Sequence, residues 1–475
     1  MAGAVLLLCA GAESASPAQT FKTFVEFDGT NGALPFSVSL VQGIDGNFYG
    51  TTSGGGANFP GANTAGVVFR IAPSGSLTTL YSFCAKSECT DGANPYAGLV
   101  LSSNGNFYGT TDGGGTSGQG TVFEVNETGG LSPLYSFDNT GDGIGPFAPL
   151  IQGINGNLYG TTSGGNIASG TVFEISAEGA LTTIYNFCSQ PGCTDGGNPN
   201  AGLIQGSDGE FYGSTPFGGS DRCRVVGCGT LFRITSEGKL TTLHRFDKAD
   251  GNEPRGDLLQ GFDGTLYGET ISGGAYNHGT IFSLSPQGLF MTLYDFCAQS
   301  HCTDGASPNG GLVQGTDGNF YGTTQAGGAR NLGTIFEITS EGTLTTLHSF
   351  DKADGAGPVG GLLQATNGIF YGTTELGGNA VCPEGCGTIF SLDTGLGPFV
   401  AFVRNPAKTG QVFGILGQGF TETISVSLNG IPASFTVVSD TFIRATVPVG
   451  ATTGFVTVVT PSGTLTSNVP FHVIP

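Results

Sequence analysis

Short apolar segments separated by glycine-rich turns recur along most of the chain. Within residues 95–137 four such segments follow one another, at 97–101, 106–111, 120–125 and 131–137. Each has the length of a β-strand and is rich in β-branched and aromatic residues, and the connections carry the Gly, Asn and Asp that favour turns. Helical spacing of apolar residues does not occur over a useful window, so the pattern predicts an all-β fold with almost no helix.

The same four-segment unit occurs seven times, and each copy contains a close variant of Asp-Gly-Asn-Phe-Tyr-Gly-Thr-Thr. The tyrosines of the seven copies are Tyr49, Tyr108, Tyr159, Tyr212, Tyr267, Tyr321 and Tyr371. The six steps between them cover 322 residues, so the mean period is about 54 residues. This period, with four antiparallel strands in each unit, is typical of the blades of a β-propeller.

Five of the seven copies have an aromatic pair inside the second strand, such as Phe48 and Tyr49 in the first, and the other two have Leu-Tyr. Successive side chains of a strand point to opposite faces, so an isolated sheet would leave one of the two rings in water. In a ring of blades, both faces of each sheet pack on neighbours. The pattern therefore predicts that both rings are buried.

The two ends of the repeat region indicate how the ring closes. Six units end in an outer strand of the Leu-Thr-Thr-Leu-Tyr-Ser-Phe type, and these strands begin at Leu77, Leu131, Leu181, Leu240, Phe290 and Leu344. The seventh copy is missing after the last unit and stands before the first, at residues 21–27. A strand from the N-terminus that completes the last blade leaves no open sheet edge. We therefore expect a seven-bladed β-propeller over residues 21–398, closed by an N-terminal strand.

Residues 399–475 break this period. They contain short alternating strands separated by turn signals such as Asn429-Gly430 and Pro461-Ser462-Gly463. Such a sequence is typical of a small immunoglobulin-like β-sandwich. We therefore expect a second domain over these residues.

The N-terminus and the cysteines both indicate export. An apolar run over residues 4–12, followed by small residues, predicts a signal peptide over residues 1–20. The ten later cysteines form close pairs in loops, which is typical of disulfides made in an oxidising compartment. The expected disulfides are Cys84–Cys89, Cys188–Cys193, Cys223–Cys228, Cys297–Cys302 and Cys382–Cys386. The competing interpretation is zinc, which would need two pairs brought together.

Charge narrows the class of partner. Only 11% of the residues are charged, yet the formal net charge is −21. A surface of this sign repels phosphate backbones and anionic headgroups, so nucleic acids and membrane surfaces are disfavoured. No stretch after the signal peptide reaches the roughly 18 apolar residues that span a bilayer. We expect a monomer, free outside the cell or at its surface, whose partner is a glycan or a protein.

The loops suggest where that partner binds. Antiparallel order places the turns between the first and second strands on one face, and the loops between the second and third strands on the other. The turns are short and uniform, whereas the loops vary in length and, with the loops between units, hold all ten paired cysteines. Binding residues tend to lie on variable loops above a rigid scaffold, so we nominate this loop face.

An acidic residue recurs in the loop between units, within an [Asp/Asn]-Gly-x-x-Pro motif. Its positions are Asn31, Asp91, Asp142, Asp195, Asp250, Asp304 and Asp354. One interpretation is a turn in which the carboxylate accepts hydrogen bonds from local backbone N–H groups. The other is that six carboxylates near one axis attract Ca²⁺, which prefers oxygen ligands.

The fifth unit departs from the others at several positions. Arg255 and Asp257 interrupt an inner segment that elsewhere holds Gly, Pro or Ser. His278 and His301 lie in loops of the same unit, and with nearby Asp304 they are candidates for a metal site or an acid and base pair. These residues make the fifth unit the weak candidate for a site specific to one blade. His244 and His348, which replace the tyrosine of an outer strand, are interpreted as structural.

A glutamine recurs at one position of six inner strands. These residues are Gln42, Gln152, Gln205, Gln260, Gln314 and Gln364. A ladder of this kind is expected to satisfy buried backbone groups between blades, because an unpaired one costs about 1 to 3 kcal/mol. The alternative is that the amides line a polar channel.

The repeats also resemble a known family. The copies NGNFYGTTDGGGTSGQGTVFEV (104–125) and DGNFYGTTQAGGARNLGTIFEI (317–338) are similar to the Gloeobacter-Verrucomicrobia (GloVer) tandem repeat of bacterial exported proteins, over roughly residues 21–398. The resemblance implies an extracellular or surface-displayed propeller of undetermined biochemical role. Residues 399–475 resemble an IPT/TIG immunoglobulin-like domain, which in exported proteins usually acts as a spacer or binding module.

Three functions are consistent with these patterns. The first is a non-catalytic secreted propeller that binds an extracellular glycan or protein through the loop face. The second is an extracellular polysaccharide lyase or hydrolase, and the third is a structural surface-layer or scaffold component. An enzyme should concentrate His, Arg, Tyr or carboxylates in one pocket. The fifth unit gives only a faint asymmetry of that kind, so the first hypothesis is preferred.

Overall fold

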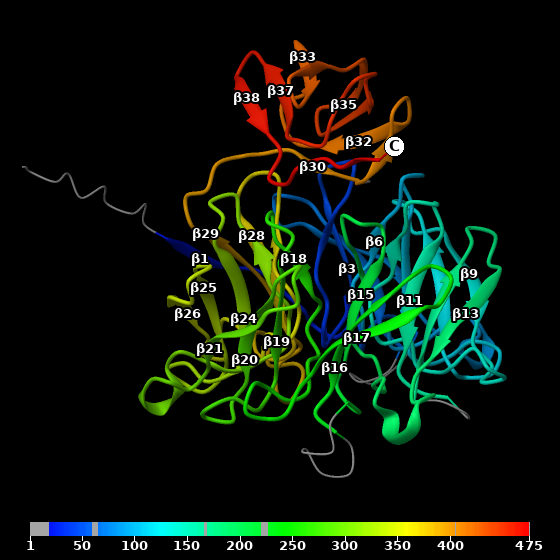
Figure 1. Ribbon diagram of the computed structural model, residues 1–475, viewed down its shortest axis with the longest axis vertical. Helices are drawn as coiled ribbons and strands as arrows, with labels where there is room; N and C mark the ends of the chain where they lie inside the picture. Colours follow the sequence, from blue (N-terminus) through cyan, green and yellow to red (C-terminus); the bar gives the residue numbers. More distant parts are fainter. Residues whose placement is uncertain (1–18, 59–64, 166–168, 220–226, 404, 475) are drawn as a thin grey trace, which may run out of the picture.

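The computed structural model describes residues 19–58, 65–165, 169–219, 227–403 and 405–474, and within them the chain is built almost entirely of short strands (Figure 1). The helical segments within these residues are single turns of 3₁₀ helix, η1 (Ser87–Cys89), η2 (Pro191–Cys193) and η4 (Ser300–Cys302). The all-β prediction is confirmed. In the described part of the chain no helix has the length and apolar character needed to cross a bilayer.

The repeat region folds into seven antiparallel sheets, here called sheet 1 to sheet 7 in chain order. Their inner strands are β2 (Val41–Gln42), β6 (Val100–Leu101), β10 (Ile151–Gln152), β14 (Ile204–Gln205), β18 (Leu259–Gln260), β23 (Val313–Gln314) and β27 (Leu363–Gln364). The second strands are β3 (Phe48–Thr52), β7 (Phe107–Thr111), β11 (Leu158–Thr162), β15 (Phe211–Thr215), β19 (Leu266–Thr270), β24 (Phe320–Ala326) and β28 (Phe370–Thr374).

The outer half of each sheet is equally regular. The third strands are β4 (Val67–Ile71), β8 (Thr121–Val125), β12 (Thr171–Ile175), β16 (Thr230–Ile234), β20 (Thr280–Leu284), β25 (Thr334–Ile338) and β29 (Thr388–Asp393). The outermost strands are β5 (Leu77–Ser82), β9 (Leu131–Ser136), β13 (Leu181–Asn186), β17 (Leu240–Arg245), β21 (Phe290–Asp295), β26 (Leu344–Ser349) and, in sheet 7, β1 (Thr20–Glu26). Sheet 6 has an additional short strand, β22 (Ala306–Pro308).

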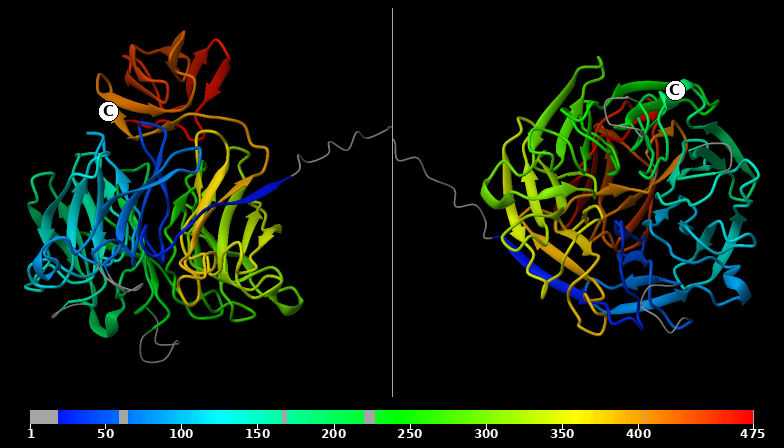
Figure 2. Two further views of the ribbon diagram at one scale, coloured as in Figure 1. Left: turned by 180° about the vertical axis from the view of Figure 1, so that it is seen from behind. Right: turned by 90° about the horizontal axis from the view of Figure 1, so that it is seen from below.

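The N-terminal strand completes the last sheet, as the sequence predicts. β1 pairs antiparallel with β29, so the order in sheet 7 is β1-β29-β28-β27. Sheet 7 also contacts sheet 1 directly, because Gln42 Oε1 accepts a hydrogen bond from the backbone N–H of Thr366 (3.0 Å). The sheets follow one another around a common axis, and β1 lies between the first and last parts of the repeat region (Figure 2).

The core lies between neighbouring sheets. Phe48 and Tyr49 are 2% and 1% exposed, which confirms the prediction that both faces of the second strand are buried. Tyr49 of sheet 1 stacks on Phe107 of sheet 2 at 4.1 Å between ring centroids. The same contact joins sheet 7 to sheet 1, where Phe48 lies 4.4 Å from Tyr371. Each sheet therefore supplies half of two interfaces, and no sheet has a core of its own.

The glutamine ladder mostly ties one sheet to the one before it. Gln152 Oε1 accepts from the backbone N–H of Ser103 (3.0 Å). Equivalent bonds to the preceding sheet are made by Gln42, Gln205, Gln260 and Gln364. Gln314 is the exception, because its Oε1 is buried without a partner. The interpretation that the ladder satisfies backbone groups between sheets therefore fits five of the six glutamines.

The C-terminal residues form a separate β-sandwich. One sheet contains β30 (Ala401–Phe402), β32 (Val412–Leu416), β36 (Phe442–Thr446) and β35 (Phe435–Ser439), in that order. The other contains β34 (Ile431–Pro432), β33 (Ser425–Leu428), β37 (Val456–Thr460) and β38 (Gly463–Thr466), while β31 (Ala407–Lys408) pairs with β39 (Val473–Ile474). Fully buried Ile415, Leu428 and Phe471 belong to its own apolar core.

This sandwich lies on the turn face of the repeat region, opposite the long loops (Figures 1 and 2). Thr441 Oγ1 donates to the carbonyl oxygen of Ile44 (2.7 Å), and Leu416 and Phe442 pack in one cluster with Tyr49. A cavity of about 260 Å³ remains between the two parts. The sandwich therefore contacts the turn face, and the long loops lie on the opposite face.

Candidate ligand-binding site on the loop face

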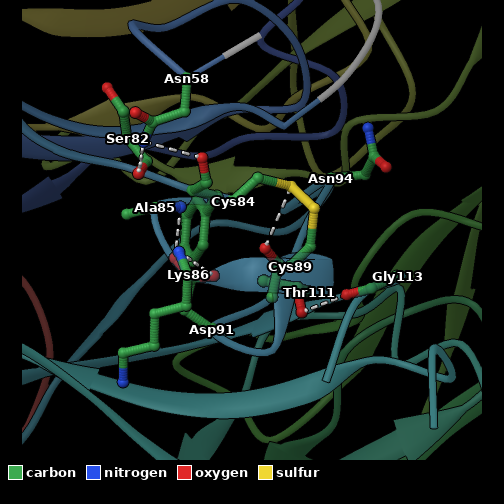
Figure 3. Close-up of a disulfide and its surroundings, with 12 residues drawn as sticks. Asn58, Ser82, Cys84, Ala85, Lys86, Cys89, Asp91, Asn94, Thr111 and Gly113 are labelled. Carbon is green, nitrogen blue, oxygen red and sulfur yellow. Dashed lines mark hydrogen bonds between the residues drawn. A yellow bond between two sulfur atoms is a disulfide. The ribbon is translucent and has the colours of Figure 1, made fainter. Parts of the chain in front are cut away.

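Short disulfide-closed loops lie on the outer part of the loop face. The structure contains Cys84–Cys89, Cys188–Cys193, Cys297–Cys302 and Cys382–Cys386, as the sequence predicts. Cys223, the fifth predicted partner, lies outside the described residues, and Cys228 is disulfide-bonded. Figure 3 shows the first of these loops, with the disulfide beside the turn that leads into sheet 2.

The aspartate that follows the first disulfide forms its hydrogen bonds within the same loop and with the preceding outer strand. Asp91 is fully buried and accepts hydrogen bonds from the Tyr81 hydroxyl (2.7 Å) and from the backbone N–H groups of Ala85 (2.9 Å) and Lys86 (3.2 Å) (Figure 3). Burial, together with the bond to Asp91, raises the pKa of Tyr81, so the hydroxyl stays a donor. The carboxylate thus joins an outer strand to the loop that follows it.

The same pairing recurs at the other acidic positions. Each carboxylate bonds the Tyr or His at one position of the preceding outer strand, in the pairs Tyr135–Asp142, Tyr185–Asp195, His244–Asp250, Tyr294–Asp304 and His348–Asp354. Burial of Asp250 opposes its ionised form, but hydrogen bonds from His244 and from the Asp247 N–H outweigh it and lower the pKa of Asp250. Hydrogen bonds of this kind are what the turn interpretation predicts. Ca²⁺ could bind these carboxylates only by displacing the hydrogen-bond donors.

The two outer-strand histidines have the structural role that the sequence suggests. His244 stacks on Phe290 at 3.8 Å between centroids, and His348 stacks on Phe21 of β1 at 3.7 Å. Both rings also bond their loop aspartates at 2.8 Å. Each imidazole therefore replaces a tyrosine without a change in the contacts that hold the loop.

The suggested grouping of His278, His301 and Asp304 does not form a compact ligand set. Asp304 is fully buried and engaged by Tyr294 and by the N–H groups of Ala298 and Gln299. Among the described residues, His278 instead lies in one tight group with Cys297 and Cys302, whose sulfur atoms are joined. The loop places the cysteines, and not the carboxylate, beside this histidine.

One side-chain position recurs where each interunit loop leads into the inner strand, and we call its seven members the axial ring. In every unit it is the residue that follows the loop proline. Six members are partly exposed, namely Phe36, Tyr96, Phe147, Asn200, Arg255 and Asn309, and the seventh, Val359, is buried. The three aromatic members are partly buried, and each ring contacts the next in space. Phe36 packs edge to face on Tyr96 (5.5 Å between centroids), and Tyr96 stacks on Phe147 (4.9 Å). We call these three residues the aromatic arc.

Two carboxyl groups influence the aromatic arc through their charge. A methyl group placed on Gly145, two residues before Phe147, would lie 2.9 Å from Asp112 Oδ1. Burial raises the pKa of Tyr96, and the charges of Asp112 and Glu375 raise it further. Glu375 belongs to sheet 7, so its effect on Tyr96 of sheet 2 acts across sheet 1. Burial also raises the pKa values of Asp112 and Glu375 themselves.

The opposite side of the ring is charged. Arg255 Nη2 bonds Glu253 Oε2 at 2.9 Å, and Arg255 is thereby held beside the loop. Asp257, two residues further along, accepts a hydrogen bond from the backbone N–H of Gly202 in sheet 4 (2.6 Å). Burial raises the pKa of Asp257. The structure therefore gives Arg255 and Asp257, two of the nominated residues of the fifth unit, a partner each.

A second acidic residue of sheet 5 was not nominated from the sequence. Glu269 is 1% exposed, and its Oε2 accepts from the backbone N–H of Gly311 in sheet 6 (3.0 Å), while Oε1 is buried without a partner. Burial raises the pKa of Glu269 to about 8. Equivalent positions hold Thr or Ser, as in Thr51, whose hydroxyl donates to the Ala97 carbonyl oxygen of the next sheet (2.8 Å). The change from Gly-Thr-Thr to Gly-Glu-Thr was the available signal.

The aromatic arc was likewise not nominated. Its signal is weak in the sequence, because the position after the loop proline holds aromatic, amide, basic and aliphatic residues in different units. The three side chains form one surface because units 1, 2 and 3 lie next to one another in the ring.

The fold and this surface define an all-β, disulfide-containing repeat protein with a central ring of sheets. Residues 14–226 and 224–412 match the Gloeobacter/Verrucomicrobia repeat, and residues 401–473 match the IPT/TIG domain. Because the repeat matches cover well over half of the chain, the protein belongs to the Gloeobacter/Verrucomicrobia repeat family. Both resemblances seen in the sequence are confirmed. No curated protein matches the chain.

Several solved structures are similar in arrangement at low sequence identity. A putative 6-phosphogluconolactonase from Bacteroides uniformis is 15% identical with a TM-score of 0.42, over 66% of this chain and 84% of that one. A gluconolactonase from Xanthomonas campestris is 16% identical with a TM-score of 0.38, over 62% and 84% of the two chains. A luciferin-regenerating enzyme is 10% identical with a TM-score of 0.41, over 80% and 98%.

Proposed function

We propose that the seven sheets are the blades of a closed β-propeller and that the protein is an exported, non-catalytic binder of an extracellular glycan. The binding site is the axial part of the loop face. Disulfides in the surrounding loops are consistent with an oxidising location outside the cytoplasm. The C-terminal sandwich covers the turn face and leaves the loop face free for the ligand.

The observation that carries this proposal is the aromatic arc with its flanking carboxyl groups. Phe36, Tyr96 and Phe147 form a continuous, partly exposed apolar surface. A sugar ring presents one face of C–H groups that packs on such a surface, while its hydroxyl groups donate to carboxylates at the edge. Asp112 and Glu375 supply those acceptors, and water exclusion by the bound sugar strengthens the bonds.

The scaffold is suited to binding without catalysis. In the part of the chain that the structure describes, the six acidic residues of the interunit loops are bonded to Tyr, His or backbone groups, so they hold the loops. Asp257 and Glu269 are bonded to backbone N–H groups of neighbouring sheets. Loops held in this way give a rigid platform, which suits recognition of a ligand.

A glycan array probed with the full chain, with and without Ca²⁺, tests the proposal. We expect a set of related glycans to bind, and the signal to be the same in Ca²⁺ and in a chelator. The variant Tyr96→Asn places at this position the residue of sheets 4 and 6, and it should lose these signals. Asn309→Ala, on the opposite side of the ring, is the matched control and should retain them.

The other hypotheses correspond to different outcomes. Silence of the array under both conditions contradicts the glycan form of the proposal and favours a protein partner or a scaffold role. Release of shorter or unsaturated sugars from a bound glycan would show a lyase or hydrolase. A signal that requires Ca²⁺ would restore the carboxylate ring as a metal site.

A further inference from the structure

Three loops of the protein are so alike that they form an internal comparison. Each joins two cysteines five residues apart, and each ends in a turn of 3₁₀ helix, η1, η2 or η4. All six cysteines are partly buried. The sequences between the cysteines are AKSE, SQPG and AQSH. Any difference in behaviour between the three disulfides must therefore come from a small number of neighbours.

One neighbouring position differs in its chemistry. It is the residue before the glycine that precedes the third strand, and its carbonyl oxygen accepts a backbone N–H bond from the following interunit loop. Asn94 donates to Ala65 (3.0 Å), Asn198 donates to Ser169, and Ser307 donates to His278 (2.8 Å). Ala65, Ser169 and His278 are thus equivalent in their backbone placement, and only the last brings an ionisable group.

His278 lies against the disulfide of its loop. An imidazole nitrogen of His278 and the sulfur atoms of Cys297 and Cys302 lie within 4.8 Å of one another. His278 is exposed, so an incoming thiol can reach this group from solvent. An imidazolium next to a sulfur atom stabilises a departing thiolate and so promotes thiol–disulfide exchange.

We propose that Cys297–Cys302 is a thiol-exchange site, reduced in preference to the two other disulfides of this type, with His278 as the group that assists the leaving sulfur. This goes beyond glycan binding and does not depend on it. The reductant class is a small thiol or a protein dithiol that reaches the exposed loop.

The exchange takes place in two balanced steps. A thiolate of the reductant attacks one cysteine sulfur, the S–S bond breaks, and its electron pair passes to the other sulfur, which takes a proton from the His278 imidazolium. A second thiolate then attacks the mixed disulfide, the reductant leaves as its own disulfide, and the freed cysteine sulfur takes a proton from water. The reductant loses two electrons, and the cysteine pair gains two.

Partial reduction of the folded full chain tests the proposal. The protein is treated with graded dithiothreitol, free thiols are alkylated, and each cysteine pair is followed by peptide mass spectrometry. We expect Cys297–Cys302 to be reduced at least fivefold faster than Cys84–Cys89 and Cys188–Cys193. His278→Ala and His278→Ser carry the residues of the two sister loops, and they should bring the rate within twofold of theirs.

Two further variants separate His278 from other causes. Ser169→His should accelerate reduction of Cys188–Cys193, and His301→Gly, which carries the residue of the second loop, should leave the fast rate unchanged. The unaltered disulfides serve as an internal measure that each variant is folded. Equal rates for the three pairs in the native protein overturn the proposal, as does a fast rate that survives His278→Ala or that is lost with His301→Gly.

Discussion

The two sides of the axial ring differ in chemistry although equivalent loop positions carry their side chains. On the side of sheets 1 to 3, the position after the loop proline holds Phe36, Tyr96 and Phe147, which pack on one another. On the side of sheet 5, Arg255 holds this position, paired with Glu253. The comparison teaches that the repeat fixes the backbone and leaves the axial side chains free to vary, so binding chemistry is found where equivalent positions differ.

Sheet 5 also differs below the surface of the ring. Its neighbours have a hydroxyl at the position of Glu269, whereas sheet 5 has a buried carboxyl with one oxygen unpaired. An unpaired buried polar atom costs free energy, and neighbouring bonds do not recover it. The charged side of the ring is therefore expected to be the less stable one.

The largest predicted effect tests this difference in stability. Glu269→Thr restores the residue of the sister sheets and allows a hydroxyl to donate to the next sheet, as Thr323 does to the Gly360 carbonyl oxygen (3.3 Å). Since the pKa of Glu269 is raised to about 8, the folded state retains a proton that the unfolded state releases near its usual pKa of 4.5. The free energy of unfolding of the native protein should therefore fall as pH rises from 4.5 to 8.

The variant should remove that fall. We expect the advantage of Glu269→Thr over the native protein to grow by about 5 kcal/mol between pH 4 and pH 9, as measured by urea unfolding. Ser214→Thr, at the equivalent position of sheet 4, is the control and should shift stability by less than about 0.5 kcal/mol at either pH. A constant difference between Glu269→Thr and the native protein across this range would contradict the assigned protonation.

The second prediction addresses the aromatic side. Tyr96→Asn should weaken glycan binding at least about tenfold, because it removes the central ring of a three-ring surface. Isothermal titration with a glycan identified on the array measures this. Asn309→Ala changes a partly exposed member of the ring outside the arc, and it should leave affinity within about twofold. An unchanged affinity of Tyr96→Asn would remove the distinction between the two sides.

The third prediction concerns the loops that hold both sides. His244→Phe removes the bond to Asp250 and keeps the ring that stacks on Phe290. It should cost about 1 kcal/mol at neutral pH. The lowered pKa of Asp250 means that its contribution is present above the usual aspartate pKa and is lost as pH falls below it. The difference between variant and native protein should thus shrink in acid, and a difference that grows would contradict the assignment.

The smallest effect is expected for the charged side of the ring. Arg255→Asn carries the residue of sheets 4 and 6 and breaks the bond to Glu253. Affinity for neutral glycans should change less than about threefold, since a partly exposed ion pair contributes little. A larger loss in the same titration would place the ligand across the whole ring and not on the aromatic arc.

The sequence was sufficient for those features that depend on local pattern and period. Strand order, the outer-strand starting points and the pairing of β1 with β29 all follow from alternation, turn residues and the displaced copy at the N-terminus. The cysteine pairs could be predicted because they close loops of four or five residues.

The proposed binding surface depends on contacts that local pattern does not contain. Glu375 acts on Tyr96 from the opposite end of the repeat region, and Thr441 bonds Ile44 across 397 positions. The placement of the C-terminal sandwich on the turn face therefore required the structure. The spacing of His278 marks it only as a loop histidine, and its contact with the Cys297–Cys302 disulfide depends on the packing of two loops.

Hydroxyl-radical footprinting of the protein with and without its glycan tests the central claim most directly. A ligand on the aromatic arc should shield Phe36, Tyr96 and Phe147 from oxidation, while Tyr276, which is 52% exposed on an outer loop, should be oxidised equally in both states. Protection confined to the C-terminal sandwich or the outer loops, with the three axial rings unshielded, would contradict the account.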